Sequence, residues 1–179
     1  EVLVPALPSL FGGSPSLREQ AAQLASTHGL GAAGDFLRRL ATATERSPRE
    51  RVAALEALAA LKDERLSELL PTRLEDPSPL VRGAVWKLLA STQPELLLQK
   101  LPALKRTGDW RELQAAIDSL VKLASPAADA ELGQWLKELA TGQVAPELWL
   151  ELLEAAEARS RPEFTNLVAL HRGRLTGTG

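Results

Sequence analysis

The sequence contains no cysteine and no methionine among its 179 residues. Without cysteine, the chain cannot form disulfides, thiolate metal sites, a cysteine nucleophile or a thioether link to haem. Without methionine it does not begin at its own start codon, so we expect it to be a fragment of a longer protein.

The sequence has no large excess of positive or negative charge, and it has no long apolar run. The 21 Lys and Arg residues nearly balance the 23 Asp and Glu residues, giving a formal net charge of -2. Duplex binding relies on many Lys and Arg contacts to phosphates, so we expect no nucleic-acid partner. No stretch of about 18 apolar residues is free of charges or helix breakers, so we expect no membrane span. We also expect no signal peptide within this sequence.

An element Ser-Pro-x-x-Arg recurs at residues 14–18, 47–51 and 78–82, and a weaker copy without proline occupies residues 107–111. The arginines, Arg18, Arg51, Arg82 and Arg111, are 33, 31 and 29 residues apart. These periods are typical of two-helix repeats. In the three full copies, Ser is expected to cap a helix that begins at the proline. In the weak copy, Thr107 is expected to take the place of this serine.

Each repeat element is followed by an amphipathic stretch. After Pro79, apolar residues recur along one side of a helix, and Arg82 lies at the edge of that stripe. We expect the stem of this arginine to pack and its charged head to stay in water. A second apolar helix follows in each unit, and nothing alternates as a strand does. The sequence therefore predicts an all-α fold, an α-solenoid of about five antiparallel helical hairpins.

Three segments are expected along the chain. Residues 1–13 read as the second helix of a truncated preceding repeat, residues 14–175 as the solenoid, and residues 176–179 as a linker tail.

The sequence Asp76-Pro77-Ser78-Pro79-Leu80-Val81-Arg82, followed by an apolar helix, resembles a HEAT repeat, which has the armadillo-type fold. In that family the aspartate and arginine pair within or between neighbouring units. The resemblance is cleanest at Asp76 and Arg82, whereas Arg51 and Arg18 match it only at the helix start. It implies a structural signature made of these four residues.

A longer resemblance covers most of the chain. Residues 50–101, ELQAAIDSLVKLASPAADAELGQWLKEL and VAPELWLELLEAAEARSRPEF are similar to the HEAT segment of large exported proteins from planctomycete-type bacteria. There a dehydrogenase-like propeller often precedes the segment and a haem domain with a CxxCH motif follows it. The resemblance implies an exported, periplasmic parent protein. Neither neighbouring domain is present in this chain.

Signals of chemistry are weak, and each has a structural alternative. Residues 29–34 match G-x-G-x-x-G but follow a helix, so we interpret them as a turn with Gly29 past a helix end. The two histidines, His28 and His171, lie near helix ends and outside metal-binding spacings. Glu147, Glu151 and Glu154 share a helix side, which we interpret as solvated rather than as a cation site. We expect no catalytic residue, metal or cofactor.

Candidate interaction residues are Trp86, Arg172 and Arg174. Trp86 lies off its apolar stripe, so it either anchors a partner or packs on the next repeat. Trp110, Trp135 and Trp149 are expected in the core. Arg172 and Arg174 either dock an acidic neighbour or compensate the dipole of the last helix.

Function is expected to be non-catalytic: a scaffold that spaces and docks flanking domains of the parent protein or another protein. The surface formed by the second helices is the expected docking side, with contributions from basic residues there: Arg38, Arg39, Arg73, Lys100 and Lys105. One alternative is a free-standing module that binds a protein or peptide through an exposed apolar patch. Another is a helical-repeat enzyme or nucleic-acid-binding module, which requires a continuous basic groove.

Overall fold

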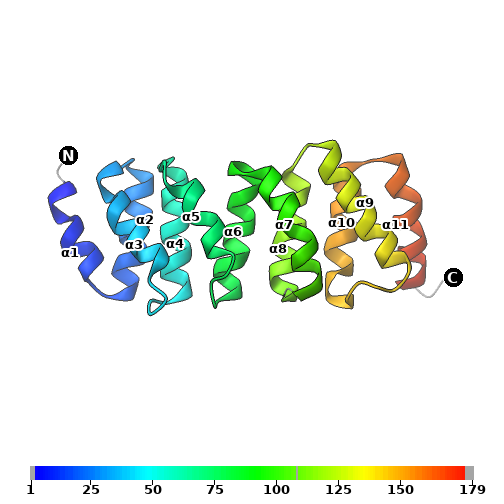
Figure 1. Ribbon diagram of the computed structural model, residues 1–179, viewed down its shortest axis with the longest axis horizontal. Helices are drawn as coiled ribbons and strands as arrows, with labels where there is room; N and C mark the ends of the chain where they lie inside the picture. Colours follow the sequence, from blue (N-terminus) through cyan, green and yellow to red (C-terminus); the bar gives the residue numbers. More distant parts are fainter. Residues whose placement is uncertain (1–2, 108, 176–179) are drawn as a thin grey trace. The chain divides into compact units, whose positions relative to one another are not determined.

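A computed structural model describes residues 3–107 and 109–175, apart from the side chains of residues 106, 107 and 170–175. Throughout these residues the secondary structure is helical, with no β-strand. The predicted all-α class is therefore confirmed. Figure 1 shows successive helices lying side by side within each of the two compact units of the chain, residues 1–88 and residues 89–179.

The first unit consists of short N-terminal elements and two helical hairpins, and then enters a longer helix. Its elements are η1 (Val4–Ala6), α1 (Leu7–Gly12), α2 (Pro15–Thr27), η2 (Gly31–Ala33), α3 (Gly34–Thr42), α4 (Pro48–Ala60), α5 (Leu66–Arg73) and the first part of α6 (Pro79–Thr92). Helix α4 packs against both α2 and α3, so the first helices of successive hairpins are neighbours. Leu37, Leu55 and Leu58 are fully buried between these helices.

The second unit takes in the end of α6 and repeats the same arrangement. Its further elements are α7 (Pro94–Thr107), α8 (Trp110–Lys122), α9 (Pro126–Ala140), η3 (Pro146–Leu148), α10 (Trp149–Arg159) and α11 (Pro162–Leu175). Helix α8 packs on α10 and α9 packs on α11, so first helices neighbour first helices and second helices neighbour second helices. Ile117, Leu132 and Leu136 are fully buried in this unit. Burying a side chain of this size contributes roughly 1.5–3 kcal/mol.

Helices α2, α4 and α9 begin with a serine cap that is followed by a proline. Ser14 and Ser47 accept hydrogen bonds from main-chain amides of α2 and α4, and Ser47 forms a full capping box with Glu50. Ser125, which lies outside the repeat element, caps α9 in the same way. Gly29 has a φ of 63° just past the end of α2, as expected of a glycine after a helix end, whereas residues 31–33 form η2 and Gly34 already begins α3.

Two expectations for the weak fourth copy are wrong. The cap of α8 is Asp109, whose carboxylate accepts from the amide of Arg111 at 2.9 Å, rather than Thr107. Arg111 is therefore the second helical residue rather than the fourth, which is the place of the other arginines. Trp110, expected in the core, is 39% exposed because it is the first residue of this helix, and Arg111 stacks on its ring.

The other two tryptophans expected in the core, Trp135 and Trp149, are more buried than Trp110. Trp135 is 2% exposed and belongs to the core of the second unit. Trp149 is half-buried, and its indole nitrogen donates to the carbonyl of Val144 at 3.0 Å. The linker tail at residues 176–179 lies outside the described residues.

Candidate docking grooves and the arginine contacts beside them

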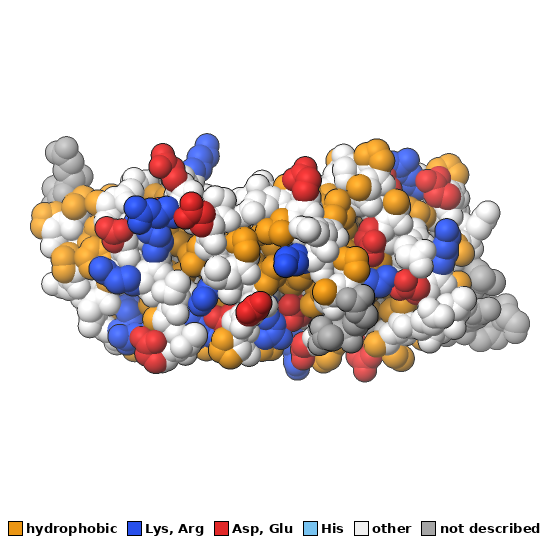
Figure 2. All heavy atoms as spheres, in the orientation of Figure 1, with side chains coloured by type: hydrophobic (Ala, Val, Ile, Leu, Met, Phe, Trp, Pro, Cys, Tyr) orange, Lys and Arg blue, Asp and Glu red, His pale blue; other side chains and the backbone are white. Residues whose placement is uncertain are grey.

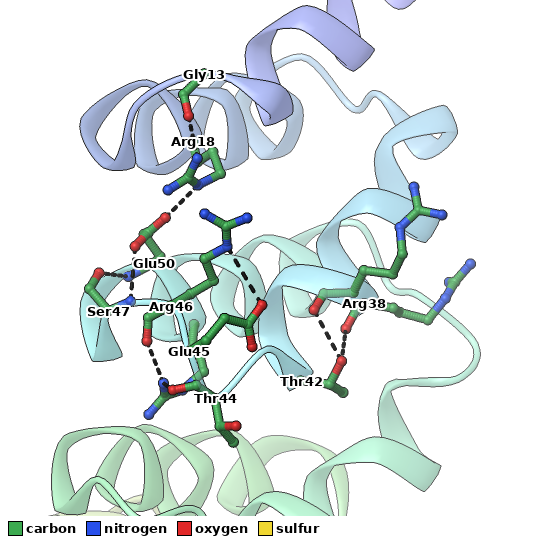
Figure 3. A network of polar contacts seen from close by, with 11 residues as sticks. Gly13, Arg18, Arg38, Thr42, Thr44, Glu45, Arg46, Ser47 and Glu50 are labelled. Carbon is green, nitrogen blue, oxygen red and sulfur yellow. Dashed lines mark hydrogen bonds and ion pairs between the residues drawn. The ribbon is translucent and has the colours of Figure 1, made fainter.

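Arg18 connects two hairpins of the first unit. It is the fourth residue of α2 and is 6% exposed. Its Nε donates to Oε1 of Glu50 on α4 at 2.5 Å, and its Nη1 donates to the carbonyl of Gly13 just before its own helix. Figure 3 shows this side chain lying between the two helices. One guanidinium thus fixes the turn into its own helix and the start of the next first helix.

Arg51 repeats this arrangement one hairpin later. It is 2% exposed, and Nη1 donates to the carbonyls of Thr44 and Arg46 in the preceding loop, at 3.1 and 2.5 Å. Nη2 donates to Oδ1 of Asp76 at 2.8 Å, and this carboxylate also accepts from the amide of Ser78. Asp76 lies in the loop that leads to the next first helix, so the contact again joins successive hairpins.

Arg82 uses the same aspartate differently. Its Nη1 donates to the main-chain carbonyl of Asp76 at 2.7 Å. The Asp76 side chain therefore pairs with Arg51 of the previous hairpin, while Arg82 holds the backbone of the loop before its own helix.

The expectation that a charged head stays in water was made for Arg82, which is half-buried, and it does not extend to Arg18 and Arg51 at the same repeat position. Both guanidinium groups are buried because carbonyls of the preceding loop and a carboxylate of the next hairpin replace water around them. A buried charge that is hydrogen-bonded and paired avoids most of the desolvation penalty. The arginines are therefore internal connectors between repeats.

Glu50 is the acidic partner of Arg18 and is itself 1% exposed. Burial alone raises the pKa of a carboxyl group, but hydrogen bonds from Ser47 and Arg18 and the charge of Arg18 outweigh it, so the pKa of Glu50 lies below its ordinary value. Glu50 is thus held as a carboxylate inside the repeat.

In the second unit the signs at a corresponding helix position are reversed. Asp129 is the fourth residue of α9, after Ser125 and Pro126, and is 8% exposed. Arg161, just before α11, pairs with its Oδ2, and Nη1 of Arg159 lies 3.3 Å from its Oδ1. The Ser-Pro-x-x-Arg element does not predict this pairing. Residues 125 and 126 repeat the serine–proline start, which is a signal in the sequence. However, aspartate occupies the fourth helical position, where the full copies have arginine.

The interaction residues expected from the sequence fall into two groups. Trp86 is 3% exposed, which favours the alternative of packing in the interior. The side chains of Arg172, Arg174 and His171 lie outside those described. His28 is exposed at the end of α2.

Of the three glutamates expected to share a helix side, Glu147 lies in η3, whereas Glu151 and Glu154 belong to α10. Glu151 accepts a hydrogen bond from the side-chain amide of Gln114 on α8, and the Glu147 carbonyl accepts from the same amide at 3.3 Å. Glu154 is exposed. Part of this acidic side therefore links α8 to α10.

An open groove of about 460 Å³ lies between the second helices α3 and α5 of the first unit. It is lined by three arginines, two acids, two threonines and a leucine: Asp35, Arg38, Arg39, Thr42, Arg65, Glu68, Leu69 and Thr72. Figure 2 shows basic side chains gathered over α3 and α5, bordered by acidic ones. We call this the α3–α5 groove.

Aromatic rings support one edge of this groove. The guanidinium carbon of Arg39 lies 4.9 Å from the ring centroid of Phe36, whose ring stacks on Phe11 with centroids 5.4 Å apart. Arg39 and both rings also line a smaller adjoining hollow of about 300 Å³. Stacking on a ring restricts a guanidinium while its N–H edges remain able to donate.

Arg38 forms an ion-pair network at the other side of the groove. Its two Nη atoms donate to Asp35 on the same helix and to Asp63 in the loop before α5. The hydrogen bond and charge of Arg38 lower the pKa of Asp35, and the nearby charges of Arg39 and Arg65 lower it further. The bond to Asp35 in turn raises the pKa of Arg38, so this network stays charged.

A second open groove of about 490 Å³ lies between the second helices α9 and α11 of the other unit. Gly133, Phe164 and Leu167 supply its apolar part, and Lys137 and Glu163 are among its charged residues. A methyl group at Gly133 would lie 3.4 Å from the Phe164 ring, so a side chain at this position would contact the ring. A groove between second helices is thus found in the described part of each unit.

The other basic residues expected on this side are placed differently. Lys105 pairs with Glu138 at 2.6 Å and lies 4.6 Å from the centroid of the Trp135 ring, so internal contacts occupy it. Arg73 donates to the hydroxyl of Thr72 at 3.3 Å, and Lys100 is exposed.

In residues 3–107 and 109–175, no group of three or more His, Asp or Glu side chains is arranged to hold a metal ion. None of the described helices is long and apolar enough to cross a membrane.

Successive antiparallel helix pairs, joined by contacts between like helices, define a helical-repeat protein. Residues 35–121, from α3 to α8, match the family described as HEAT repeats, so this part of the chain is a HEAT-repeat segment. Repeats of this family are consistent with the predicted α-solenoid. No match to a curated protein or to a solved structure reached significance.

Proposed function

We propose that this chain is a non-catalytic docking scaffold whose second-helix surfaces bind protein segments. The observation that carries the proposal is the pair of open grooves, one between α3 and α5 and one between α9 and α11. Both lie between second helices of successive hairpins, where helical-repeat proteins offer a binding surface. The HEAT-repeat segment includes the first of them.

The proposed partners are flanking domains of a parent protein or a separate protein. The resemblance to exported planctomycete-type proteins is the only support for an exported parent, and it gives the scaffold the task of spacing two enzymatic or electron-carrying domains. Hairpins of the first unit are tied to one another by the buried pairs Arg18–Glu50 and Arg51–Asp76, which suits that task.

A free-standing module that binds through an apolar patch is the second candidate. The large apolar side chains that the structure shows as exposed, Val4, Leu80, Trp110 and Leu150, lie on four different elements. This dispersion favours binding through the grooves over binding through one apolar surface. Acids interleave with the arginines of the α3–α5 groove, which also disfavours a nucleic-acid backbone.

Site-specific crosslinking in the native host tests the proposal. A photoreactive residue replaces Thr72 or Ala130, which are exposed in the two grooves, and in matched controls it replaces Gln20 or Glu154, which are exposed on first helices. We expect Thr72 and Ala130 to give crosslinks to recurring protein segments, identified by mass spectrometry. Crosslinks only from Gln20 and Glu154 would contradict docking by second helices.

A further inference from the structure

We propose that the α3–α5 groove binds an acidic, extended protein segment whose carboxylates pair with Arg39 and Arg65. This inference rests on the proposed docking function and adds the chemistry of the partner. It depends on which donors in the groove are already used inside the protein and which remain available.

Arg39 and Arg65 supply the available donors. Both side chains are exposed, and in the described part of the chain no carboxylate lies within ion-pair distance of either. Arg39 is held over Phe36, so it loses less freedom on binding than an unsupported arginine. A planar guanidinium donates two parallel hydrogen bonds to a carboxylate, which makes carboxylates its preferred partners.

The remaining polar groups of the groove do not provide the same function. Arg38 is occupied by Asp35 and Asp63. The hydroxyls of Thr42 and Thr72 donate to carbonyls of their own helices, at 3.0 and 2.7 Å. Arg39, which stacks on a ring, and Arg65 are therefore the donors available to a ligand. Leu69 offers an apolar contact beside them.

Glu68 opposes the proposed ligand. It lines the groove three residues after Arg65, and Asp35 is the other carboxylate there. Asp35 is compensated by Arg38, so Glu68 is the charge most able to repel an acidic segment. Two acids within the lining also reject a long polyanion more strongly than a short peptide that places its carboxylates at the arginines.

Fluorescence anisotropy with a labelled peptide of alternating Glu and Leu tests the inference on the whole chain. The matched probes are the same peptide with Gln in place of Glu, and an oligothymidylate of equal charge. We expect the acidic peptide to bind and the Gln peptide not to. Arg39→Gln and Arg65→Gln should each weaken binding about tenfold, the usual loss of a charge-assisted hydrogen bond.

Two further variants separate site binding from general attraction. Glu68→Gln should strengthen binding by about threefold because it removes the opposing charge. Arg49→Gln removes an exposed arginine of α4 outside the groove and should leave binding unchanged. Circular dichroism checks that each variant is folded, as expected for exposed positions.

The inference is overturned if Arg49→Gln weakens binding as much as Arg39→Gln, if the oligothymidylate binds as well as the peptide, or if the peptide does not bind. Crosslinks from Thr72 that persist in any of these cases leave the docking function standing and refute only the acidic partner. Loss of crosslinks from both grooves, with peptide binding intact, refutes the docking function instead.

Discussion

Arg49 and Arg51 both lie in the first turn of α4, yet their environments differ completely. Arg49 is exposed, whereas Arg51 is 2% exposed and joins a loop, its own helix and the next hairpin through Asp76. At the scale of single residues, the stability of the repeat therefore depends on a few buried ion pairs rather than on the many charges at its surface.

Arg51→Ala tests this dependence. The variant leaves the buried carboxylate of Asp76 without its cation, so we expect the free energy of unfolding to fall by about 3–5 kcal/mol. Arg49→Ala, two residues away, should change it by less than about 0.5 kcal/mol. Urea denaturation followed by circular dichroism measures both, and equal losses would show that Arg51 is not a connector.

Glu50 predicts a dependence on pH. Its pKa is lowered in the folded protein from the ordinary 4.5, so its ionised form stabilises the fold above that pH. This contribution disappears as the pH falls through the folded-state pKa. We expect Glu50→Gln to be less stable than the wild type at pH 7, with the difference shrinking as the pH is lowered below 4.5. Urea denaturation at several pH values checks this, and a constant difference would contradict it.

At the scale of elements, the helix starts share one design with different strengths. Ser47 accepts from the amide of Glu50 at 3.2 Å while Glu50 accepts from the amide of Ser47 at 2.9 Å. Ser14 makes a single exposed bond of 3.4 Å. The same serine–proline pattern therefore gives a reciprocal cap at α4 and only a weak cap at α2.

Ser47→Ala should lower the free energy of unfolding by about 1 kcal/mol, the usual cost of losing a cap. Ser14→Ala is the matched control, with a smaller expected loss because its bond is longer and exposed. Thermal denaturation of both variants provides the measurement. A loss at Ser14 equal to that at Ser47 would show that the capping box adds nothing.

At the scale of the whole molecule, each unit is built from neighbours in sequence. Like helices of successive hairpins pack together, α2 on α4 in the first unit and α8 on α10 in the second. The stability of such a protein is close to a sum of repeat and interface contributions. The grooves arise at this scale, because a groove needs the second helices of two hairpins.

The sequence by itself determined the helical class, the hairpin repeat and the helix starts that carry serine and proline, such as those of α2 and α4. These follow from local patterns: serine before proline, apolar residues at helical spacing, and Gly29 at a positive φ. It also indicated that Arg38 and Arg39 belong to the surface formed by the second helices.

Only the tertiary structure decided which charges are buried and which remain available. The spacing of Arg51 and Asp76 does not reveal that one buries the other, because the two meet through packing of separate hairpins. For the same reason, the repeated arginine position does not reveal the pair of Asp129 and Arg161. Trp110 is likewise exposed at its helix start although it lies in an apolar stripe. Periodicity along a chain specifies helices, whereas the partner of each side chain depends on contacts between helices.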